Sequence, residues 1–287
     1  MNHHPQWLKK RLYFNDSFFE TKNIISGHSV NTVCESARCP NMSECYSRKF
    51  ATFMMLGRAC TRTCAFCSVK KTETEPVDIG EPGRIAGCVG RLGLRYVILT
   101  SVTRDDLEDG GSSQFVKAVY SVRNVSRETI IELLIPDFAG DANSIKAAVL
   151  SGADIIGHNI ETVKRLYPVV RKEADYSRSL EVLKTIKEIN PEVITKSAIL
   201  AGMGEREGEI IHAMEDLRAA GCDILAIGQY LRPSETNHPV DRFVAPEEFD
   251  RLRRSGIALG FKNVSAGPFV RSSYLAEEAF SAVSYKL

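Results

Sequence analysis

The stretch ATFMMLGRACTRTCAFC, residues 51–67, joins a short apolar run to three closely spaced cysteines. The run covers residues 51–56 and ends at Gly57, which is typical of a buried strand followed by a turn. The cysteines that follow, at the spacing C-x3-C-x2-C, are Cys60, Cys64 and Cys67. This order predicts a strand whose carboxyl end carries a loop with three thiol groups.

Five more apolar runs continue the pattern along the chain. They cover residues 94–100, 129–135, 153–156, 193–200 and 223–227. Amphipathic helical patterns lie between such runs, at residues 113–122, 142–150, 179–189 and 207–220. Apolar strands that alternate with helices predict βαβ units and a parallel sheet. Six units are too few to close an eight-stranded barrel, so we expect an α/β fold with a partial (β/α)6 TIM-like barrel. Working residues should lie at the carboxyl ends of its strands.

The two ends of the chain do not follow this alternation. Residues 1–49 have weak periodicity and contain three cysteines, which predicts an extension that wraps around the barrel. Residues 50–261 form the predicted barrel, and residues 262–287 form a C-terminal extension that is helical over residues 274–284.

Composition and charge limit the possible functions. Hydrophobic residues make up 44% and charged residues 25% of the 287 positions, as in ordinary globular proteins. The net charge of +1 gives no indication of nucleic-acid binding. No apolar run approaches 18 residues and the first ten residues lack the apolar centre of a signal peptide, so we expect no membrane span and a cytoplasmic location. The short basic run at residues 9–11 is expected to be a solvated surface.

The cysteine loop at residues 60–67 is best explained as a metal site, because cytosolic cysteines are rarely paired as disulfides. Three thiolates on one tight loop can hold three corners of a [4Fe–4S] cluster, which normally takes four cysteine ligands. The fourth iron then stays open to a substrate. A structural zinc site is the alternative, although zinc takes four closed ligands and this loop offers three.

A second cysteine triplet lies upstream, at the spacing C-x4-C-x5-C. Its members are Cys34, Cys39 and Cys45. Alone this spacing would be ambiguous, but beside the first loop it suggests an auxiliary cluster. The two isolated cysteines, Cys88 and Cys222, are expected to be small buried hydrophobic residues.

The C-x3-C-x2-C loop, with Phe66 just before its last cysteine, resembles the cluster loop of the radical SAM superfamily. Longer segments resemble the lipoyl synthase family within that superfamily, in the family's order. They are residues 34–45, 51–54, 60–67, 99–107, 158–162, 228–234 and 271–274. The upstream triplet combined with the terminal sequence Arg-Ser-Ser-Tyr at residues 271–274 is specific to this family. Four positions depart from the family pattern without removing a cysteine: Tyr46, Arg58, Thr103 and Ala198.

The resemblance implies two [4Fe–4S] clusters and S-adenosylmethionine (SAM) as cosubstrate. The implied ligands of the SAM-binding cluster are Cys60, Cys64 and Cys67. The implied ligands of the auxiliary cluster are Cys34, Cys39, Cys45 and Ser273. Serine is a rare iron ligand, so spacing alone does not indicate this role. Ser272 or Ser273 could also serve as the N-cap of the predicted C-terminal helix, and the two roles are compatible.

The resemblance further implies that residues at the strand ends hold SAM, whose ammonium and ribose groups need oxygen acceptors. The expected SAM contacts are Phe66, Thr100, Ser101, Arg104, Asp105, Asn159, Glu161 and Lys196. Asp105 could instead begin a turn, and Lys196, inside an apolar strand, needs a partner such as a carboxylate in the barrel. His158 at the same rim is expected to be structural. A substrate or surface role is equally open for Arg232.

The implied activity is the insertion of sulfur at C6 and C8 of an octanoyl chain, with the auxiliary cluster as sulfur donor. The implied partners are octanoylated lipoyl carrier proteins, such as H protein or an E2 lipoyl domain, and a ferredoxin or flavodoxin reductant. Two other classes stay open. One is a different radical SAM enzyme, such as a methylthiotransferase acting on RNA or protein. The other is a non-enzymatic iron–sulfur or zinc scaffold or redox sensor.

Overall fold

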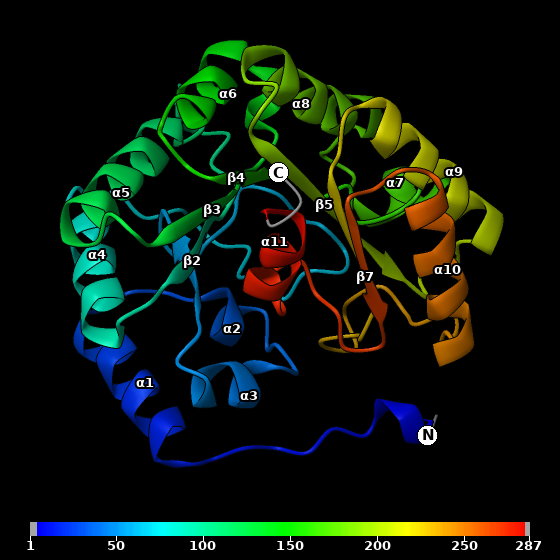
Figure 1. Cartoon of the computed structure of the whole chain (residues 1–287), viewed down its shortest axis with the longest axis horizontal. Helices are drawn as coiled ribbons and strands as arrows, with labels where there is room; N and C mark the ends of the chain where they lie inside the picture. Colours follow the sequence, from blue (N-terminus) through cyan, green and yellow to red (C-terminus); the bar gives the residue numbers. More distant parts are fainter. Residues whose placement is uncertain (1–4, 285–287) are drawn as a thin grey trace.

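The computed structural model describes residues 5–284, so residues 1–4 and 285–287, at the outer ends of the two predicted extensions, lie outside it. Within that range seven strands form one parallel sheet, with each strand paired to the next along the chain. The strands are β1 Thr52–Met55, β2 Tyr96–Ser101, β3 Ile130–Leu134, β4 Ile155–Gly157, β5 Ile194–Ala201, β6 Ile224–Gln229 and β7 Asn263–Gly267. No pairing joins β1 to β7 within the described residues, so the barrel stays open on one side (Figure 1).

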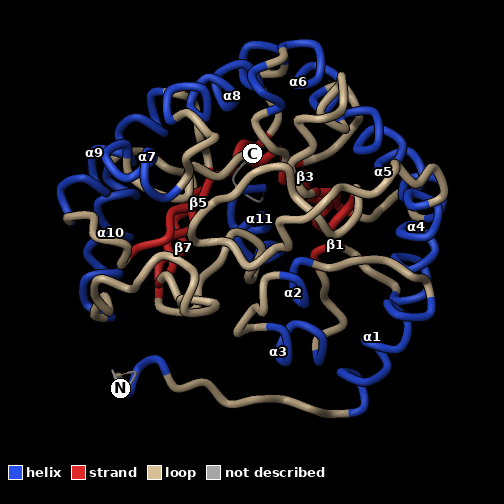
Figure 2. Tube along the Cα trace, turned by 180° about the vertical axis from the view of Figure 1, so that it is seen from behind, coloured by secondary structure: helices blue, strands red, loops and turns tan. Residues whose placement is uncertain are grey.

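Helices surround the sheet and also occupy its open side. Figure 1 shows an outer ring made of α4 Glu81–Leu92, α5 Ser112–Val125, α6 Ala142–Val149, α8 Tyr176–Ile189, α9 Glu207–Ala219 and α10 Pro246–Ala258. The remaining helices are α1 Asp16–Gly27, α2 Val33–Ser36, α3 Met42–Ser47, α7 Tyr167–Val170 and α11 Ala276–Ser284. Short 3-10 turns are η1 Gln6–Leu8, η2 Phe138–Gly140 and η3 Lys164–Leu166. Figure 2, from the opposite side, shows α2 and α3 beside the end of β1.

The predicted α/β class and open barrel are confirmed, and each of the six predicted strands is present. The structure adds β7, which pairs with β6. The sequence of β7, NVSAG, contains only one large apolar residue, Val264, so it carries no apolar run. This strand falls inside the segment predicted as the C-terminal extension, and the three-part division of the chain stays a prediction.

The strands bury side chains on both faces, as expected for a parallel sheet covered by helices. On the outer face they pack against the ring of helices in the main core. A smaller core lies inside the barrel, where α11 packs against the strands. It contains Tyr96, Ile98, Ile155, Ile194 and Ile224 from the strands and Ala276, Ala279 and Val283 from α11. In Figure 1, α11 accordingly stands at the centre of the ring of strands. The C-terminal helix therefore fills the barrel interior.

A buried ion pair crosses the barrel next to this apolar layer. Lys196 Nζ lies 2.9 and 2.8 Å from the two carboxylate oxygens of Glu132. The Tyr96 hydroxyl donates a further hydrogen bond of 2.5 Å to the same carboxylate. All three residues are buried. The carboxylate partner that the sequence demanded for Lys196 is therefore Glu132, on β3.

The N-terminal extension covers the free edge of β1. Thr32 forms an antiparallel bridge with Phe53, and the Met54 amide donates to the Asn31 carbonyl at 2.8 Å. Tyr46 fills the space behind this bridge, where its hydroxyl lies 2.9 Å from the Thr32 hydroxyl. These contacts satisfy backbone groups that an edge strand otherwise exposes.

The basic run at residues 9–11 differs from its prediction. Lys10 Nζ lies 2.7 Å from a carboxylate oxygen of Glu44, and the Lys10 side chain is only 15% exposed. The expectation of a solvated surface is therefore wrong for Lys10, because the extension folds back over the chain and leaves its side chain half-buried. Lys9 is exposed.

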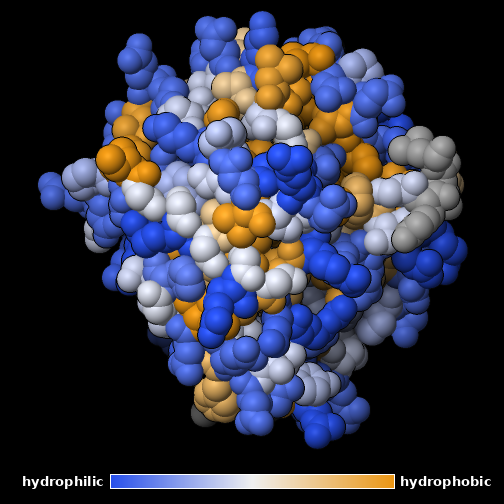
Figure 3. Space-filling model, turned by 60° about the vertical axis from the view of Figure 1, so that its left-hand side comes forward, coloured by the Kyte–Doolittle hydropathy of each residue, from blue (hydrophilic) through white to orange (hydrophobic). Residues whose placement is uncertain are grey.

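Two further expectations concern cysteine burial and membrane spans. Cys88 and Cys222 are fully buried, which confirms that they belong to the core. Among residues 5–284, no helix has the length and apolarity needed to cross a membrane. On the face shown in Figure 3, hydrophilic side chains cover most of the surface, with apolar side chains exposed between them.

The Glu132–Lys196 pair gives a stability prediction. Lys196→Met leaves the Glu132 carboxylate buried without a cation, and we expect the free energy of unfolding to fall by about 3–5 kcal/mol. Replacing both residues by Met should cost much less, because no charge is then left unpaired. Urea denaturation of the apoprotein, followed by circular dichroism, measures both variants. Lys184→Met, on the exposed face of α8, is the control; a Lys196→Met midpoint equal to this control would contradict the argument.

Candidate functional site

The cysteine loop at residues 60–67 follows β1 at the carboxyl edge of the sheet, where the sequence predicts it. Backbone hydrogen bonds tie this loop to neighbouring loops. The Thr61 amide donates to the Thr103 carbonyl after β2 at 3.1 Å, and the Ala65 amide donates to the Val170 carbonyl at the end of α7 at 2.8 Å. The three cysteines of the loop are half-buried. The fold thus holds all three thiols in one partly enclosed place.

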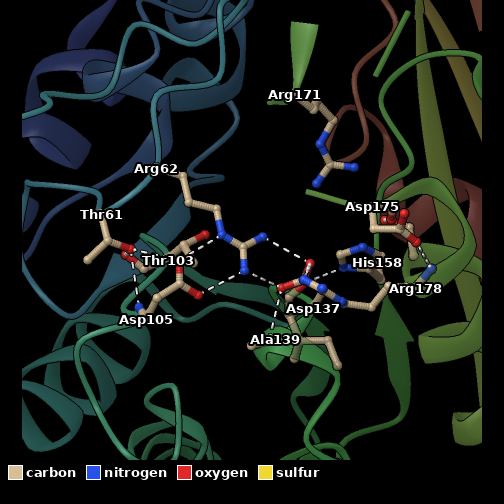
Figure 4. A network of polar contacts seen from close by, with 12 residues as sticks. Thr61, Arg62, Thr103, Asp105, Asp137, Ala139, His158, Arg171, Asp175 and Arg178 are labelled. Carbon is tan, nitrogen blue, oxygen red and sulfur yellow. Dashed lines mark hydrogen bonds and ion pairs between the residues drawn. The ribbon is translucent and has the colours of Figure 1, made fainter. Parts of the chain in front are cut away.

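Arg62, inside the cysteine loop, clamps the loop to two other strand ends (Figure 4). Its Nε and Nη2 each donate a 2.8 Å hydrogen bond to the carboxylate of Asp105, which follows β2. Its Nη1 and Nη2 donate to the carboxylate of Asp137, which follows β3, at 2.9 and 2.6 Å. Asp105, an expected SAM contact, is therefore bound by a guanidinium of the protein. Neither Arg62 nor Asp137 was among the predicted site residues, although Asp137 lies only three positions after the end of β3.

The charges of this clamp stabilise one another in a buried setting. Burial alone would raise the pKa of Asp137, but the hydrogen bonds and charge of Arg62 outweigh it and lower that pKa to about 2. Burial would lower the pKa of Arg62, but its bonds to Asp105 and Asp137 raise it instead. Both carboxylate and guanidinium therefore stay charged, and both have their hydrogen bonds satisfied by each other.

The upstream triplet lies on the extension that covers β1. Cys34 is on α2, Cys45 is on α3, and Cys39 is in the connection between them. The Cys39 amide donates to the Cys34 carbonyl at 3.0 Å, which fixes the connection as a tight turn. Ser68, one residue after the other triplet, donates from its hydroxyl to the Ser36 carbonyl on α2 at 2.7 Å. The two cysteine triplets are thereby joined across the open side of the barrel.

The C-terminal segment lies against the upstream triplet. The Tyr274 hydroxyl donates to the Glu44 carboxylate at 2.9 Å, and the Asn41 amide nitrogen donates to the Phe269 carbonyl at 2.7 Å. Ser273, the expected serine ligand, thus directly precedes Tyr274, which contacts Glu44, the residue before Cys45. Gly228 on β6 permits this close approach, because a Cβ there would lie 1.9 Å from the Val270 carbonyl oxygen.

The donor set fits iron–sulfur clusters better than single metal ions. All eight cysteines are free thiols. Within residues 5–284, no three His, Cys, Asp or Glu side chains are grouped closely enough to hold one metal ion. A structural zinc ion takes four closed ligands, whereas each triplet offers three thiols, which suits three corners of a [4Fe–4S] cluster.

Burial raises the pKa of four of the six triplet thiols, those of Cys34, Cys45, Cys64 and Cys67. Burial, followed by the charge of nearby cysteines, raises the pKa of Cys45 to about 12 and that of Cys34 further. Burial is also the main cause that raises the pKa of Cys67 to about 11. Metal ligation deprotonates a coordinating thiol outright, so a bound cluster would reverse this preference.

The expected SAM contacts after β2 are largely engaged within the protein. The Thr100 hydroxyl donates to the Leu134 carbonyl at 2.7 Å. Arg104 binds the carboxylate of Asp106 through Nε and Nη2, both at 2.8 Å. The Ser101 hydroxyl, by contrast, is buried and has no hydrogen-bond partner among the described residues. The structure therefore leaves Ser101 as the residue of this group with open bonding capacity.

After β4, Asn159 and Glu161 form a chain with the C-terminal segment. The Asn159 amide nitrogen donates to the Glu161 carboxylate at 2.9 Å, and the Ser272 hydroxyl donates to Asn159 Oδ1 at 3.1 Å. Burial raises the pKa of Glu161, although the charge of Arg171 opposes this shift. Since α11 begins at Ala276, neither Ser272 nor Ser273 directly precedes it as an N-cap.

His158 points an unsatisfied nitrogen into the same region. Its Nδ1 lies 2.9 Å from the Ile135 carbonyl, so Nδ1 carries the proton and Nε2 is an acceptor. Nε2 is buried without a hydrogen-bond partner in the described part of the chain. Burial, helped by the charge of Arg171, lowers the pKa of His158 to about 4, so the ring is neutral at neutral pH. A buried acceptor of this kind fits a ligand that donates a hydrogen bond.

The other two expected SAM contacts are Phe66 and Lys196, and the sequence left the role of Arg232 open. Phe66 is partly buried and packs against the main core. The Lys196 ammonium is held by Glu132, as described above. Arg232 donates to carbonyls of its own loop, at Asn237 (2.8 Å) and Glu235, which places it in a local structural role.

A cavity of about 430 Å³ opens beside the upstream triplet. It lies between α3, the start of β2 and the start of α11. Cys45, Arg48, Tyr96, Tyr274 and Glu277 contribute to its lining. Of the upstream triplet, Cys45 therefore lines a cavity on the side that carries the amino-terminal end of β2.

Comparison with known proteins places the sequence among close relatives. Residues 54–217 match the Radical SAM superfamily. The lipoyl synthase of Alkaliphilus metalliredigens is 46% identical over 275 residues, which cover 96% of this chain and 95% of that protein. The lipoyl synthase of Caldanaerobacter subterraneus subsp. tengcongensis is 49% identical, covering 96% of this chain and 97% of that protein. That of Geobacter metallireducens is 48% identical, covering 95% of each.

Solved structures share the fold at much lower identity. Methylornithine synthase matches with a TM-score of 0.56 and 18% identity over 71% of this chain and 61% of that chain. HydG, a maturase of the [FeFe]-hydrogenase, matches with a TM-score of 0.57 and 14% identity over 72% of this chain and 49% of that chain. The chain thus spans less than two thirds of both solved proteins, and the likeness concerns the barrel fold.

The clamp at Arg62 gives a second stability prediction. Arg62→Lys keeps the charge but cannot replace two bidentate pairs, so buried Asp137 loses part of its hydrogen bonding. We expect the free energy of unfolding of the apoprotein to fall by about 3 kcal/mol. Arg253→Lys, in an exposed pair on α10, is the matched control and should change it by less than about 0.5 kcal/mol. Equal urea midpoints for the two variants would refute the clamp.

His158 gives a pH prediction. Its pKa is lowered on folding, from 6.5 to about 4, so the unfolded chain takes up the proton first. Stability should therefore fall as the pH drops from about 6.5 to 4, by up to roughly 3 kcal/mol relative to His158→Asn. The groups that face the ring are Arg171, Asp137, Arg62 and the Ile135 carbonyl. Urea titrations of both apoproteins at several pH values test this; parallel pH profiles would show that His158 is not held neutral.

Proposed function

The chain belongs to the lipoyl synthase family of the radical SAM superfamily, and on this premise we propose that it inserts two sulfur atoms into an octanoyl chain. The insertion sites are C6 and C8 of an octanoyl group carried on a lysine of a lipoyl carrier protein. The family resemblance noted in the sequence is confirmed by relatives that match along nearly their whole length. Their length agreement supports the activity of the whole enzyme rather than that of one part.

The ligand sets divide between the two triplets. We assign Cys60, Cys64 and Cys67 to the SAM-binding [4Fe–4S] cluster, and Cys34, Cys39, Cys45 and Ser273 to the auxiliary [4Fe–4S] cluster. When bound, the two clusters supply the electron that cleaves SAM and the sulfur that is transferred. The observation that supports this assignment is the placement of the triplets: one lies on the loop after β1 and the other on α2, α3 and their connection, and the hydrogen bond from Ser68 to Ser36 holds the two side by side.

The protein's own residues position the reactants and exclude water. The Arg62 clamp fixes the loop of the first triplet against the ends of β2 and β3. The packing of α11 inside the barrel closes it to solvent near the amino-terminal ends of the strands. Ser101 and His158 Nε2 have open bonding capacity near the carboxyl edge, which supports a role for both in binding SAM or the substrate. Phe66, Asn159 and Glu161 stay proposed SAM contacts at the same edge.

The proposed partners follow from the same activity. An octanoylated H protein or E2 lipoyl domain would present its lysine arm at the barrel, and a ferredoxin or flavodoxin would supply electrons. A cytoplasmic location is supported by the eight free cysteines, which a reducing compartment keeps unpaired.

A single mass-spectrometric experiment tests the proposal. The protein, reconstituted with iron and sulfide without oxygen, is incubated with SAM, dithionite and an octanoyl-lysyl peptide. We expect 5′-deoxyadenosine together with peptide that carries one and then two sulfur atoms. Deoxyadenosine without peptide sulfur would remove the octanoyl substrate or the sulfur-donor role, and neither product would favour a non-enzymatic scaffold.

Cysteine variants separate the roles of the two triplets. Replacing Cys34, Cys39 and Cys45 by Ala should leave deoxyadenosine formation but abolish peptide sulfur. Replacing Cys60, Cys64 and Cys67 by Ala should abolish both products. Cys88→Ala, a buried cysteine outside both triplets, is the control and should retain both. Peptide sulfur from the first variant would reject the assignment of the auxiliary cluster.

A further inference from the structure

The N-terminal segment before α1 is fastened to the rest of the protein at Lys10. Figure 1 shows this segment as an extended stretch that runs past α3 toward the side of β7 and α10. Apart from η1, residues 5–15 form no helix or strand. Beyond η1, whose backbone bonds end at Lys9, the segment depends on side-chain contacts for a fixed position. Lys10 supplies several of these contacts, and the Ser47 hydroxyl adds a 3.4 Å bond to the Tyr13 carbonyl.

The Lys10 ammonium is surrounded by four groups from two distant parts of the chain. It lies 2.7 Å from the Glu44 carboxylate and donates a hydrogen bond to Asn41 Oδ1. It also lies 5.1 Å from the centroid of the Phe269 ring and 4.8 Å from that of Tyr274. Aromatic faces attract a cation more strongly when it is partly desolvated. The Lys10 and Glu44 side chains are 15% and 24% exposed, so water screens this cluster only in part.

The four groups flank the proposed ligands of the auxiliary cluster on both sides. Asn41 and Glu44 lie between Cys39 and Cys45, in the α3 region. Phe269 and Tyr274 bracket the segment that contains Ser273. These two parts of the chain are more than 220 positions apart in sequence and are also joined directly, by the bonds from Tyr274 to Glu44 and from Asn41 to Phe269. Lys10 therefore sits at the seam between the cysteine-bearing and serine-bearing halves of one ligand set.

We propose that Lys10 is a positioning residue of the auxiliary site, which holds the N-terminal segment across the seam and keeps the two halves of the ligand set together. The inference rests on the proposed assignment of Cys34, Cys39, Cys45 and Ser273 to one cluster. A single ammonium makes this possible because it can satisfy a carboxylate, an amide oxygen and two aromatic faces at once. Removing it loosens the three segments from one another, although all four ligand side chains are still present.

The test measures how firmly the auxiliary site holds iron. The parent is the full chain with Cys60, Cys64 and Cys67 replaced by Ala, reconstituted so that iron binds only at the upstream triplet. Lys10→Met keeps the length of the side chain but removes its charge, and we expect iron release to a chelator to accelerate by roughly tenfold. The EPR spectrum of the reduced cluster should change as well. Chymotrypsin should cut faster at Tyr13 or Phe14, both exposed residues of the freed segment.

Two matched variants and a second parent chain, in which the upstream cysteines are replaced instead, serve as controls. Lys9→Met, on the same segment but exposed, should behave like the parent. Lys10→Arg keeps the cation and should restore slow iron release. In the chain with Cys34, Cys39 and Cys45 replaced by Ala, Lys10→Met should leave iron retention at the other triplet unchanged, which shows that the fold is intact.

The outcomes separate this inference from the assignment on which it rests. A parent that binds no iron at all would reject the auxiliary-site assignment, whatever Lys10 does. A parent that binds iron, with equal release rates for Lys10→Met and Lys9→Met, would overturn the role of Lys10. Faster release in Lys10→Arg as well, or iron loss from the other triplet, would show a general loss of structure and would also overturn it.

Discussion

A parallel sheet of seven strands that does not close on itself leaves two free edges and an open interior. The unpaired backbone groups of an edge strand need partners, and the inward side chains need an apolar cover. Residues from both ends of the chain meet these needs: Asn31 and Thr32 bind the edge of β1, and α11 fills the interior. The N-terminal extension and the C-terminal segment are thereby brought into contact with each other. This is why the upstream cysteines and the segment at residues 271–274, which are far apart in sequence, lie side by side.

The barrel interior changes character from one end to the other. An apolar layer is formed by α11 and the isoleucines of alternate strand positions, with the Glu132–Lys196 pair beside it. The carboxyl edge carries polar groups such as Ser101 and His158. A buried ion pair adds little net stability, because desolvation of the two charges offsets their attraction. It does link β3 to β5 across the intervening strand β4, since neither charge can leave its partner without a large cost. The polar groups at the carboxyl edge of the sheet are therefore supported by a rigid, packed layer of the barrel interior.

Most of the regular structure, and the kind of partner that Lys196 needs, could be predicted from the sequence, because local periodicity and burial carry that information. The contacts that shape the site could not. Arg62 is 43 positions from Asp105 and 75 from Asp137, and nothing local marks these residues as partners. Lys10 belongs to a run of three basic residues that gives no sign of which one is half-buried. The strand β7 escaped prediction for a different reason: Val264 is its only large apolar residue, and its pairing with β6 makes it a strand.

Three of the four charged residues that the family resemblance assigns to SAM are already in ion pairs in this protein, and the fourth, Glu161, accepts a hydrogen bond from the Asn159 amide. Arg104 binds Asp106, Asp105 is held by Arg62, and Lys196 is held by Glu132. Recruiting any of them to a ligand means breaking a pair that is at least partly buried, which leaves a charge without its partner. Groups that need no such rearrangement are the Ser101 hydroxyl and His158 Nε2, which are buried and lack partners in the described part of the chain. A polar ligand that enters this edge gains most from those two groups, while the paired charges keep the loops around it in place.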